Sequence, residues 1–144
     1  MLLLAHICWD SNVFAQCETN AIVVSIAPGY SKSGVVFNME AGLWPVAGKL
    51  GILGGPIIYN EEMIDKGENA KVAQLDFTGR LIYKVTELGD NSPQIFTLFG
   101  TVRGTVGASN RCYFSLGRDD LLGLEPFYSN KTGMGINLLF TTKL

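Results

Sequence analysis

Residues 72–85, VAQLDFTGRLIYKV, decide the fold of this chain because side-chain polarity alternates along them. One set of alternate positions is apolar or glycine and the other is mostly polar; the sets are Ala73, Leu75, Phe77, Gly79, Leu81, Tyr83 and Val85, and Gln74, Asp76, Thr78, Arg80 and Lys84. A period of two residues indicates a β-strand with two chemically different faces. At about 3.3 Å per residue this strand spans about 46 Å, whereas an ordinary strand has about 5–6 residues.

Similar patterns predict further strands. Alternation recurs at residues 35–43, 96–103, 111–117 and 133–141, and apolar runs at 21–27, 48–59 and 121–128 give weaker candidates. Turn-forming residues lie between them; the predicted turns are 28–29, 32–34, 89–93, 108–110, 119–120 and 129–131. The sequence therefore predicts an all-β fold, an antiparallel up-and-down β-barrel of about eight strands, the smallest common closed barrel.

The composition fits this fold and excludes some functions. A chain of 144 residues suits one domain. Charged residues make up 17% of the chain, against about 25% in soluble domains, and there are 17 glycines and 8 phenylalanines. The net charge is −2 and no two basic residues are adjacent, so we expect no nucleic-acid partner.

The first residues have the pattern of an export signal. Residues 1–16 begin with an apolar run and precede an abrupt change to polar residues at Cys17, which is typical of a secretory signal peptide. We predict a signal peptide at 1–16 and a single β-barrel domain at 17–144; the alternative is the first strand of a cytosolic domain. Export permits disulfides, but the expected strand order separates Cys17 from Cys112, so a free Cys112 is expected.

The two faces of the strands favour a membrane barrel. In the last strands the polar face consists of small residues that suit a narrow interior; these are Ser115, Gly117, Gly133, Gly135, Asn137 and Thr141. The apolar face is large and continuous, as a lipid-facing band requires. Five aromatic residues near expected strand ends fit membrane interfaces, or alternatively the rim of a soluble barrel; they are Trp44, Tyr59, Tyr83, Tyr113 and Tyr128.

The sequence offers no convincing catalytic, cofactor or metal site. The single histidine, His6, lies in the predicted signal, so histidine-dependent nucleophilic catalysis and a zinc site are unsupported. The glycine-rich run at residues 48–56 continues as a strand, whereas a phosphate-binding loop requires a following helix. We predict that the chain is not an enzyme and binds no cofactor; a carboxylate mechanism on the loops is the least favoured alternative.

Charges on the inward face predict a structural network in the lumen. An isolated buried charge is costly, so charges inside a narrow barrel must be paired. We expect Glu40 and Asp76 to face Arg80 and Arg103, where they fix the register of the barrel. Glu125 and Lys84 are further candidates for the same face.

A polar connection at residues 60–70 is the longest predicted loop. Its acidic residues lack the spacing of a calcium-binding loop, so we expect a solvated loop. The same loop is the candidate contact for an envelope protein partner.

The signal at residues 1–16, the amphipathic strands and the ending GMGINLLFTTKL at 133–144 together resemble the small, eight-stranded, bacterial outer-membrane β-barrel class. The resemblance implies contact with outer-membrane lipid and a final amphipathic strand containing Phe140. It also implies a non-enzymatic structural, adhesion or envelope-accessory role.

A second hypothesis remains open, a soluble exported barrel of the lipocalin kind in the periplasm or outside the cell. Its apolar face would point inward and bind an apolar small molecule. Phe77, Leu81, Phe96 and Leu98 would then line the pocket.

Overall fold

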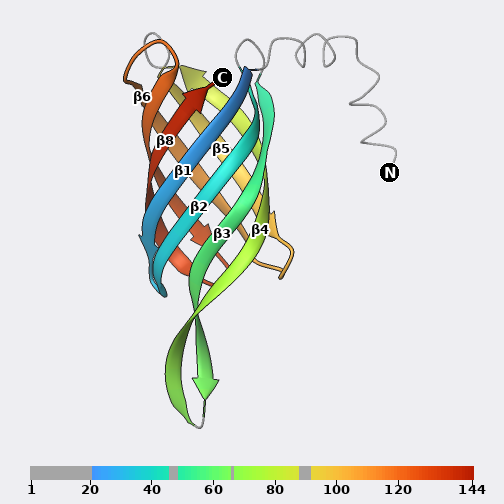
Figure 1. Ribbon diagram of the computed structural model, residues 1–144, viewed down its shortest axis with the longest axis vertical. Helices are drawn as coiled ribbons and strands as arrows, with labels where there is room; N and C mark the ends of the chain where they lie inside the picture. The colour runs from blue at the N-terminus through green and yellow to red at the C-terminus, as the bar shows by residue number, and fades with distance from the viewer. Residues whose placement is uncertain (1–20, 46–48, 66, 88–91) are drawn as a thin grey trace, which may run out of the picture.

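The computed structural model describes residues 21–45, 49–65, 67–87 and 92–144 as a closed antiparallel barrel (Figure 1). Each strand pairs with its neighbours in chain order, and β8 closes the barrel against β1. The strands are β1 (Ala21–Ser31), β2 (Gly34–Trp44), β3 (Leu50–Asp65), β4 (Glu68–Glu87), β5 (Pro93–Thr101), β6 (Val106–Ser115), β7 (Asp120–Ser129) and β8 (Gly133–Lys143). The predicted all-β, eight-stranded, up-and-down barrel is confirmed. The predicted signal at 1–16 and Cys17 lie outside the described residues.

Two predicted turns are wrong because the strands run through them. β1 continues through Pro28–Gly29, and the ladder to β8 is interrupted there, between the pairs Ile26↔Phe140 and Gly29↔Asn137. A proline is tolerated in a strand where its missing N–H falls at such an interruption. Residues 108–110 belong to β6, where Ser109 faces the lumen and hydrogen-bonds to charged side chains.

The predicted loop at residues 60–70 is also wrong, because most of it forms the end of a long β-hairpin. β3 and β4 have 16 and 20 residues, and they pair with each other as far as Asp65↔Glu68. The pairing of β3 with β2 reaches only Tyr59, so the six pairs from Asn60↔Ala73 to Asp65↔Glu68 extend beyond the barrel. At about 3.3 Å per residue this ribbon is about 20 Å long. It projects from the end of the barrel opposite the C-terminus (Figure 1).

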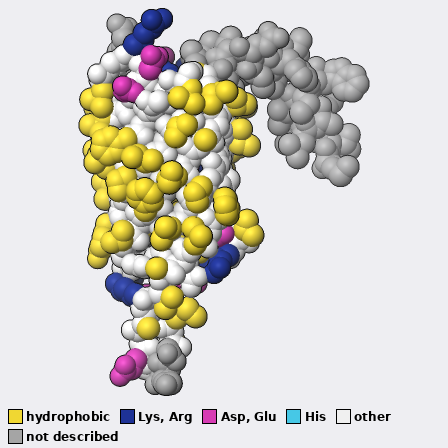
Figure 2. Space-filling view, in the orientation of Figure 1, with side chains coloured by type: hydrophobic (Ala, Val, Ile, Leu, Met, Phe, Trp, Pro, Cys, Tyr) yellow, Lys and Arg dark blue, Asp and Glu magenta, His cyan; other side chains and the backbone are white. Residues whose placement is uncertain are grey.

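The outer wall of the barrel is apolar. Leu75, Phe77, Leu81, Tyr83 and Val85 of β4 are all exposed, while the alternate residues point inward. The other strands follow the same alternation, and between the two ends no outward-facing residue of the described chain is charged. Figure 2 shows hydrophobic side chains along the wall and charged side chains at the ends and on the hairpin.

The lumen is filled by side chains in three layers. An apolar cluster occupies the end that carries the C-terminus and consists of Val23, Ala27, Trp44, Leu53, Ile82, Ile95, Tyr113, Leu121 and Leu139. A second cluster lies toward the hairpin and consists of Val36, Ile57, Tyr59, Phe99 and Phe127. A polar layer lies between them. Glycines make room for the second cluster, since a Cβ at Gly135 would lie 2.3 Å from Phe127 Cζ and one at Gly107 would lie 2.4 Å from Phe99 Cζ.

Three of the five aromatic residues predicted at membrane interfaces are inside the barrel. Trp44 and Tyr113 are buried and pack edge to face, with ring centroids 5.0 Å apart and an angle of 87° between the rings. Tyr59 is buried in the hairpin-side cluster, and its hydroxyl accepts a hydrogen bond from Thr105 at 3.3 Å. Tyr83 and Tyr128 are exposed on the wall. A position near a strand end does not determine which face of the strand a side chain occupies.

Candidate functional site

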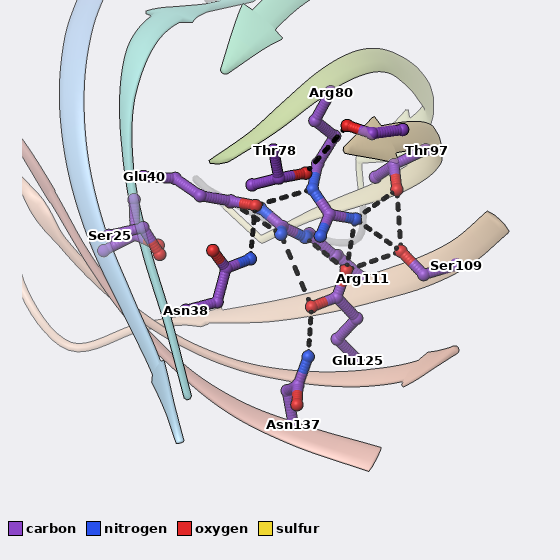
Figure 3. Close-up of polar contacts among 12 residues, drawn as sticks. Ser25, Asn38, Glu40, Thr78, Arg80, Thr97, Ser109, Arg111, Glu125 and Asn137 are labelled. Atoms are coloured by element: carbon purple, nitrogen blue, oxygen red, sulfur yellow. Dashed lines mark hydrogen bonds and ion pairs between the residues drawn. The ribbon is translucent and has the colours of Figure 1, made fainter. Parts of the chain in front are cut away.

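Four charged side chains form a closed ring in the polar layer of the lumen (Figure 3). Arg80 Nε lies 2.7 Å from Glu40 Oε1, and Arg80 Nη1 lies 2.8 Å from Glu125 Oε1. Arg111 completes the ring, because its Nη2 lies 2.7 Å from Glu40 Oε2 and its Nε lies 2.9 Å from Glu125 Oε1. The charge ring, as we call these four residues, therefore alternates acid and base and has no net charge.

The period-two pattern of the strands brings these residues together. Glu40, Arg80, Arg111 and Glu125 occupy inward positions of β2, β4, β6 and β7, and all four are almost completely buried. Their long side chains reach the barrel axis from different sides of the wall. The charge ring therefore ties together strands that are not all neighbours in the sheet.

Polar residues of the same layer give the charge ring further hydrogen bonds. Asn38 Nδ2 donates to Glu40 Oε1 at 2.7 Å, and Asn137 Nδ2 donates to Glu125 Oε2 at 2.9 Å. Arg80 Nη1 donates to Thr97 Oγ1 at 2.6 Å, and Ser109 donates to Glu125 Oε1 at 2.5 Å. Buried charges are tolerated when each has an opposite charge and further hydrogen bonds, and this arrangement meets that condition.

Arg80 also connects the charge ring to the aromatic residues on the hairpin side. Its guanidinium carbon lies 4.6 Å from the centroid of the Phe99 ring. A guanidinium over an aromatic face is attracted by the ring quadrupole, more strongly when both groups are desolvated. Arg80 therefore contacts both the polar layer and the hairpin-side cluster.

The structure brings together two of the four residues predicted to form the lumen network, Glu40 and Arg80. Asp76 lies nearer the hairpin end, where it accepts hydrogen bonds from the backbone N–H groups of Phe77 at 2.7 Å and Arg103 at 3.1 Å. The Arg103 side chain is exposed and donates to Gln74 Oε1 at 2.5 Å. Asp76 thus holds the β5–β6 turn to β4. The prediction that Asp76 and Arg103 belong to the network is wrong, because Arg80 forms its ion pairs with Glu40 and Glu125.

Sequence reasoning missed Arg111 and gave Glu125 only a secondary place. The inward face of β7 carries Leu121, Gly123 and Phe127 beside Glu125, so its polarity does not alternate visibly. Arg111 is the first residue of the alternation predicted at 111–117, next to the turn predicted at 108–110, whereas β6 extends from Val106 to Ser115. The two-residue period could have revealed both residues. Each lies an even number of positions along its own strand from residues whose side chains are buried in the lumen.

The layered lumen leaves little open space. The cavity on the hairpin side of the charge ring has a volume of about 20 Å³. Small-molecule sites usually have about 300–1,000 Å³, so this interior does not suit a drug-sized ligand or a wide pore. Within the described residues there is no cluster of three or more His, Cys, Asp or Glu side chains arranged to hold a metal ion.

A second polar feature lies outside the barrel, at the base of the hairpin. An open cleft of about 440 Å³ is lined by Lys32, Ser33, Glu61, Glu62, Asn130, Lys131 and Gly133. Lys131 Nζ lies 3.8 Å from Glu61 Oε1 and donates to the carbonyl of Arg103 at 2.9 Å. The β7–β8 turn therefore holds the base of the hairpin.

Comparison of the chain with protein-family models, with curated proteins and with solved structures gave no match. In the described part of the chain, no helix has the length and apolar character needed to cross a membrane. Cys112 is a free thiol among the described residues, and its relation to Cys17 lies outside them.

Proposed function

We propose that this chain is an outer-membrane β-barrel protein of bacterial type, without enzymatic activity, that presents the β3–β4 hairpin to a partner. The observation that carries the proposal is the distribution of polarity. The outer wall is apolar and uncharged between its ends, while the lumen contains the buried charge ring. A soluble barrel has the opposite arrangement, since its polar face meets water.

The exposed apolar surface is too large for an ordinary soluble domain. Soluble monomers rarely expose a continuous apolar patch of more than a few hundred Å². Here the exposed fraction is 60% for Phe77, 58% for Ile52 and 51% for Ile136, which lie on three different strands. Contact with lipid explains this exposure on all sides of the barrel.

The height of the apolar wall matches that of a membrane. From Leu75 to Val85 the outward face of β4 spans ten residue steps, about 33 Å along the strand. A strand tilted by about 40° then covers about 25 Å along the barrel axis, the height of the apolar band in transmembrane barrels. The closed barrel also supports a membrane location, because a sheet without free edges satisfies its backbone hydrogen bonds in lipid.

The bacterial outer membrane is the proposed location because transmembrane barrels of this size are characteristic of it. The signal pattern at residues 1–16 supports export through the inner membrane. With a filled lumen, the barrel serves as an anchor and not as a channel.

The hairpin is the proposed site of a structural, adhesion or envelope-accessory function. Its two strands pair only with each other beyond Tyr59 and therefore have unpaired outer edges. Met63 and Ile64 near its tip have exposed fractions of 48% and 81%. Unpaired edges with exposed apolar residues are suited to binding an extended segment of another protein.

The alternative, a soluble barrel that binds an apolar ligand inside, has less support. Phe77, Leu81, Phe96 and Leu98 are on the outer wall, with exposed fractions between 38% and 60%. The lumen that such a ligand would need is filled by the two apolar clusters and the charge ring.

The test is fractionation of cells that express the full chain, followed by gel electrophoresis of the membrane fraction with and without boiling. We expect the protein in the outer-membrane fraction, with a change in mobility on heating because the folded barrel resists detergent. Recovery in the soluble periplasmic fraction would contradict the proposal. A variant that lacks residues 61–72 loses most of the hairpin and keeps the strands of the barrel. We expect this variant to reach the membrane and to lose only the binding of the partner.

A further inference from the structure

The two strands of the β3–β4 hairpin have free edges of different length where they leave the barrel (Figure 1). The edge of β3 is the shorter one, because Gly34 at the start of β2 reaches the side chain of Asn60; a Cβ at Gly34 would lie 2.5 Å from Asn60 Nδ2. Pairing of β4 with β5 begins only at Thr78. No strand of the described chain pairs with the outer side of Asn69–Leu75, which we call the β4 edge.

Every second residue of β4 directs its backbone N–H and C=O groups toward this edge. The carbonyl oxygen of Phe77 accepts a hydrogen bond from the N–H of Val102 in the β5–β6 turn at 3.1 Å, so Phe77 faces away from β3. In an antiparallel ladder this direction alternates from one residue to the next, and β3 and β4 pair without a change of register down to the hairpin tip. The residues that face outward along the β4 edge are therefore Asn69, Lys71, Ala73 and Leu75. Six steps at about 3.4 Å make an edge about 20 Å long.

The two faces beside the β4 edge differ in chemistry. Lys71 is the one charged residue of β4 between Asn69 and Leu75. It is exposed, and no carboxylate of the described chain lies within 4 Å of its ammonium group. The opposite face carries Val72 and, across the ladder on β3, Met63, with exposed fractions of 40% and 48%. One face therefore offers an unpaired positive charge and the other an apolar surface.

We propose that the β4 edge binds an extended segment of another protein as an additional strand, in which acidic and apolar side chains alternate. Residues directly opposite each other in a ladder share a face, so a carboxylate opposite Lys71 would lie about 5 Å from it. Glu62 lies on the far side of β4 and is about twice as far from such a carboxylate. Apolar residues of the same segment pack against Val72. The inference rests on the proposed role of the hairpin in binding a partner, and it specifies the edge and the chemistry of that partner.

The test uses two synthetic peptides of about nine residues, long enough to cover an edge of about 20 Å. Valine and glutamate alternate in the first peptide, and lysine replaces glutamate in the second. The binding of each peptide to the full barrel, folded in uncharged detergent micelles, is measured by calorimetry. We expect the glutamate peptide to bind about fivefold more tightly, because opposite charges on paired strands attract and like charges repel. Hydrogen exchange should become slower at the amides of the four residues that face outward along the β4 edge.

Two proline substitutions separate the edges of the hairpin. Ala73→Pro removes an N–H group that points to the β4 edge, so the β3–β4 ladder keeps its hydrogen bonds. We expect this variant to bind the glutamate peptide about tenfold more weakly. Ile64→Pro is the matched control, because Ile64 lies opposite Asn69 and therefore faces the free edge of β3. This variant should bind as the wild type does. A third variant, Lys71→Glu, should reverse the preference between the two peptides.

The proposal is overturned if the two proline variants bind equally well or if Lys71→Glu leaves the preference unchanged. It is also overturned if neither peptide binds and the amides remain unprotected. Lys71 then keeps other strands away from the edge, as lysines on edge strands do. Cell fractionation tests the location separately. A barrel in the outer membrane that binds no peptide contradicts this inference alone, whereas a soluble barrel that binds the glutamate peptide contradicts the location alone.

Discussion

The guanidinium of Arg111 lies 2.7 Å from the carboxylate of Glu40, although 71 positions separate the two residues in the chain. Arg111 is on β6 and Glu40 on β2, two strands that are not neighbours in the sheet. The ion pair therefore crosses the lumen. It depends on the closure of the barrel, which places β2 and β6 on different sides of the lumen.

Removing one member of the charge ring should destabilise the barrel strongly. Arg111→Met leaves Glu40 and Glu125 buried with reduced compensation, which typically costs about 3–5 kcal/mol. Urea unfolding followed by the fluorescence of the buried Trp44 measures the change. Lys131→Met is the control, since its ion pair with Glu61 is partly exposed and should contribute at most about 1 kcal/mol. Equal effects of the two substitutions would refute a stabilising role for the charge ring.

Small residues on the inward face should not tolerate enlargement. A Cβ at Gly135 meets Phe127 Cζ at 2.3 Å and the carbonyl oxygen of Tyr30 at 2.6 Å, so Gly135→Ala should cost about 1–3 kcal/mol. Gly79→Ala is the matched control on the outer wall, where a Cβ has no atom within 4 Å. The two urea midpoints should therefore differ, with Gly79→Ala near the wild type. A stable Gly135→Ala barrel would show that the hairpin-side cluster can rearrange.

A charge introduced on the outer wall should destabilise the barrel by an amount that depends on its position along the barrel axis. Leu81→Arg lies near the middle of the apolar span of β4 and should cost about 2–4 kcal/mol in a lipid bilayer. Tyr30→Arg, near the hairpin end of β1, should cost about 0–1 kcal/mol. Unfolding of both variants in lipid vesicles provides the measurement. Two small and similar costs would argue against a lipid-facing wall, because exposed substitutions in water usually change stability by less than about 0.5 kcal/mol.

The contact of Asp76 with the β5–β6 turn should have a local effect. Asp76→Asn weakens the hydrogen bonds from the N–H groups of Phe77 and Arg103, with an expected cost of about 1–2 kcal/mol. Hydrogen–deuterium exchange at the Arg103 amide should become faster, while the amides near the charge ring remain protected. A variant that loses protection at the charge ring instead would place Asp76 in the central network.

The barrel itself was predictable because its strands differ in polarity on their two faces. β4 is the clearest case, since its inward residues from Gln74 to Arg80 are polar and its outward residues are not. Residues 60–70 were predicted as a loop because they are rich in charge, and charge density does not reveal that two strands continue to pair beyond the barrel. The proline in β1 similarly indicated a turn, because the sequence does not show where a ladder is interrupted.

Two of the four residues of the charge ring, Glu40 and Arg80, could be predicted as members of the network from the sequence. Glu40 and Arg80 lie on strands with visible alternation, so their inward direction could be inferred. Arg111 begins the alternation predicted at 111–117, directly after a predicted turn, whereas β6 starts at Val106. Glu125 lies beside large inward residues such as Phe127, which hide the alternation. The choice of partners depends on the level that each residue occupies along the barrel axis, and this level follows from the strand registers.

The continuity of β3 and β4 has a mechanical consequence. Both strands run without a break from the hairpin into the wall, where β3 pairs with β2 and β4 pairs with β5. A pull on the hairpin tip along the barrel axis acts largely along these strands and loads the flanking hydrogen bonds in shear. Many bonds then share the force at once, whereas peeling a strand away would break them one at a time. The hairpin is therefore built to transmit tension into the barrel.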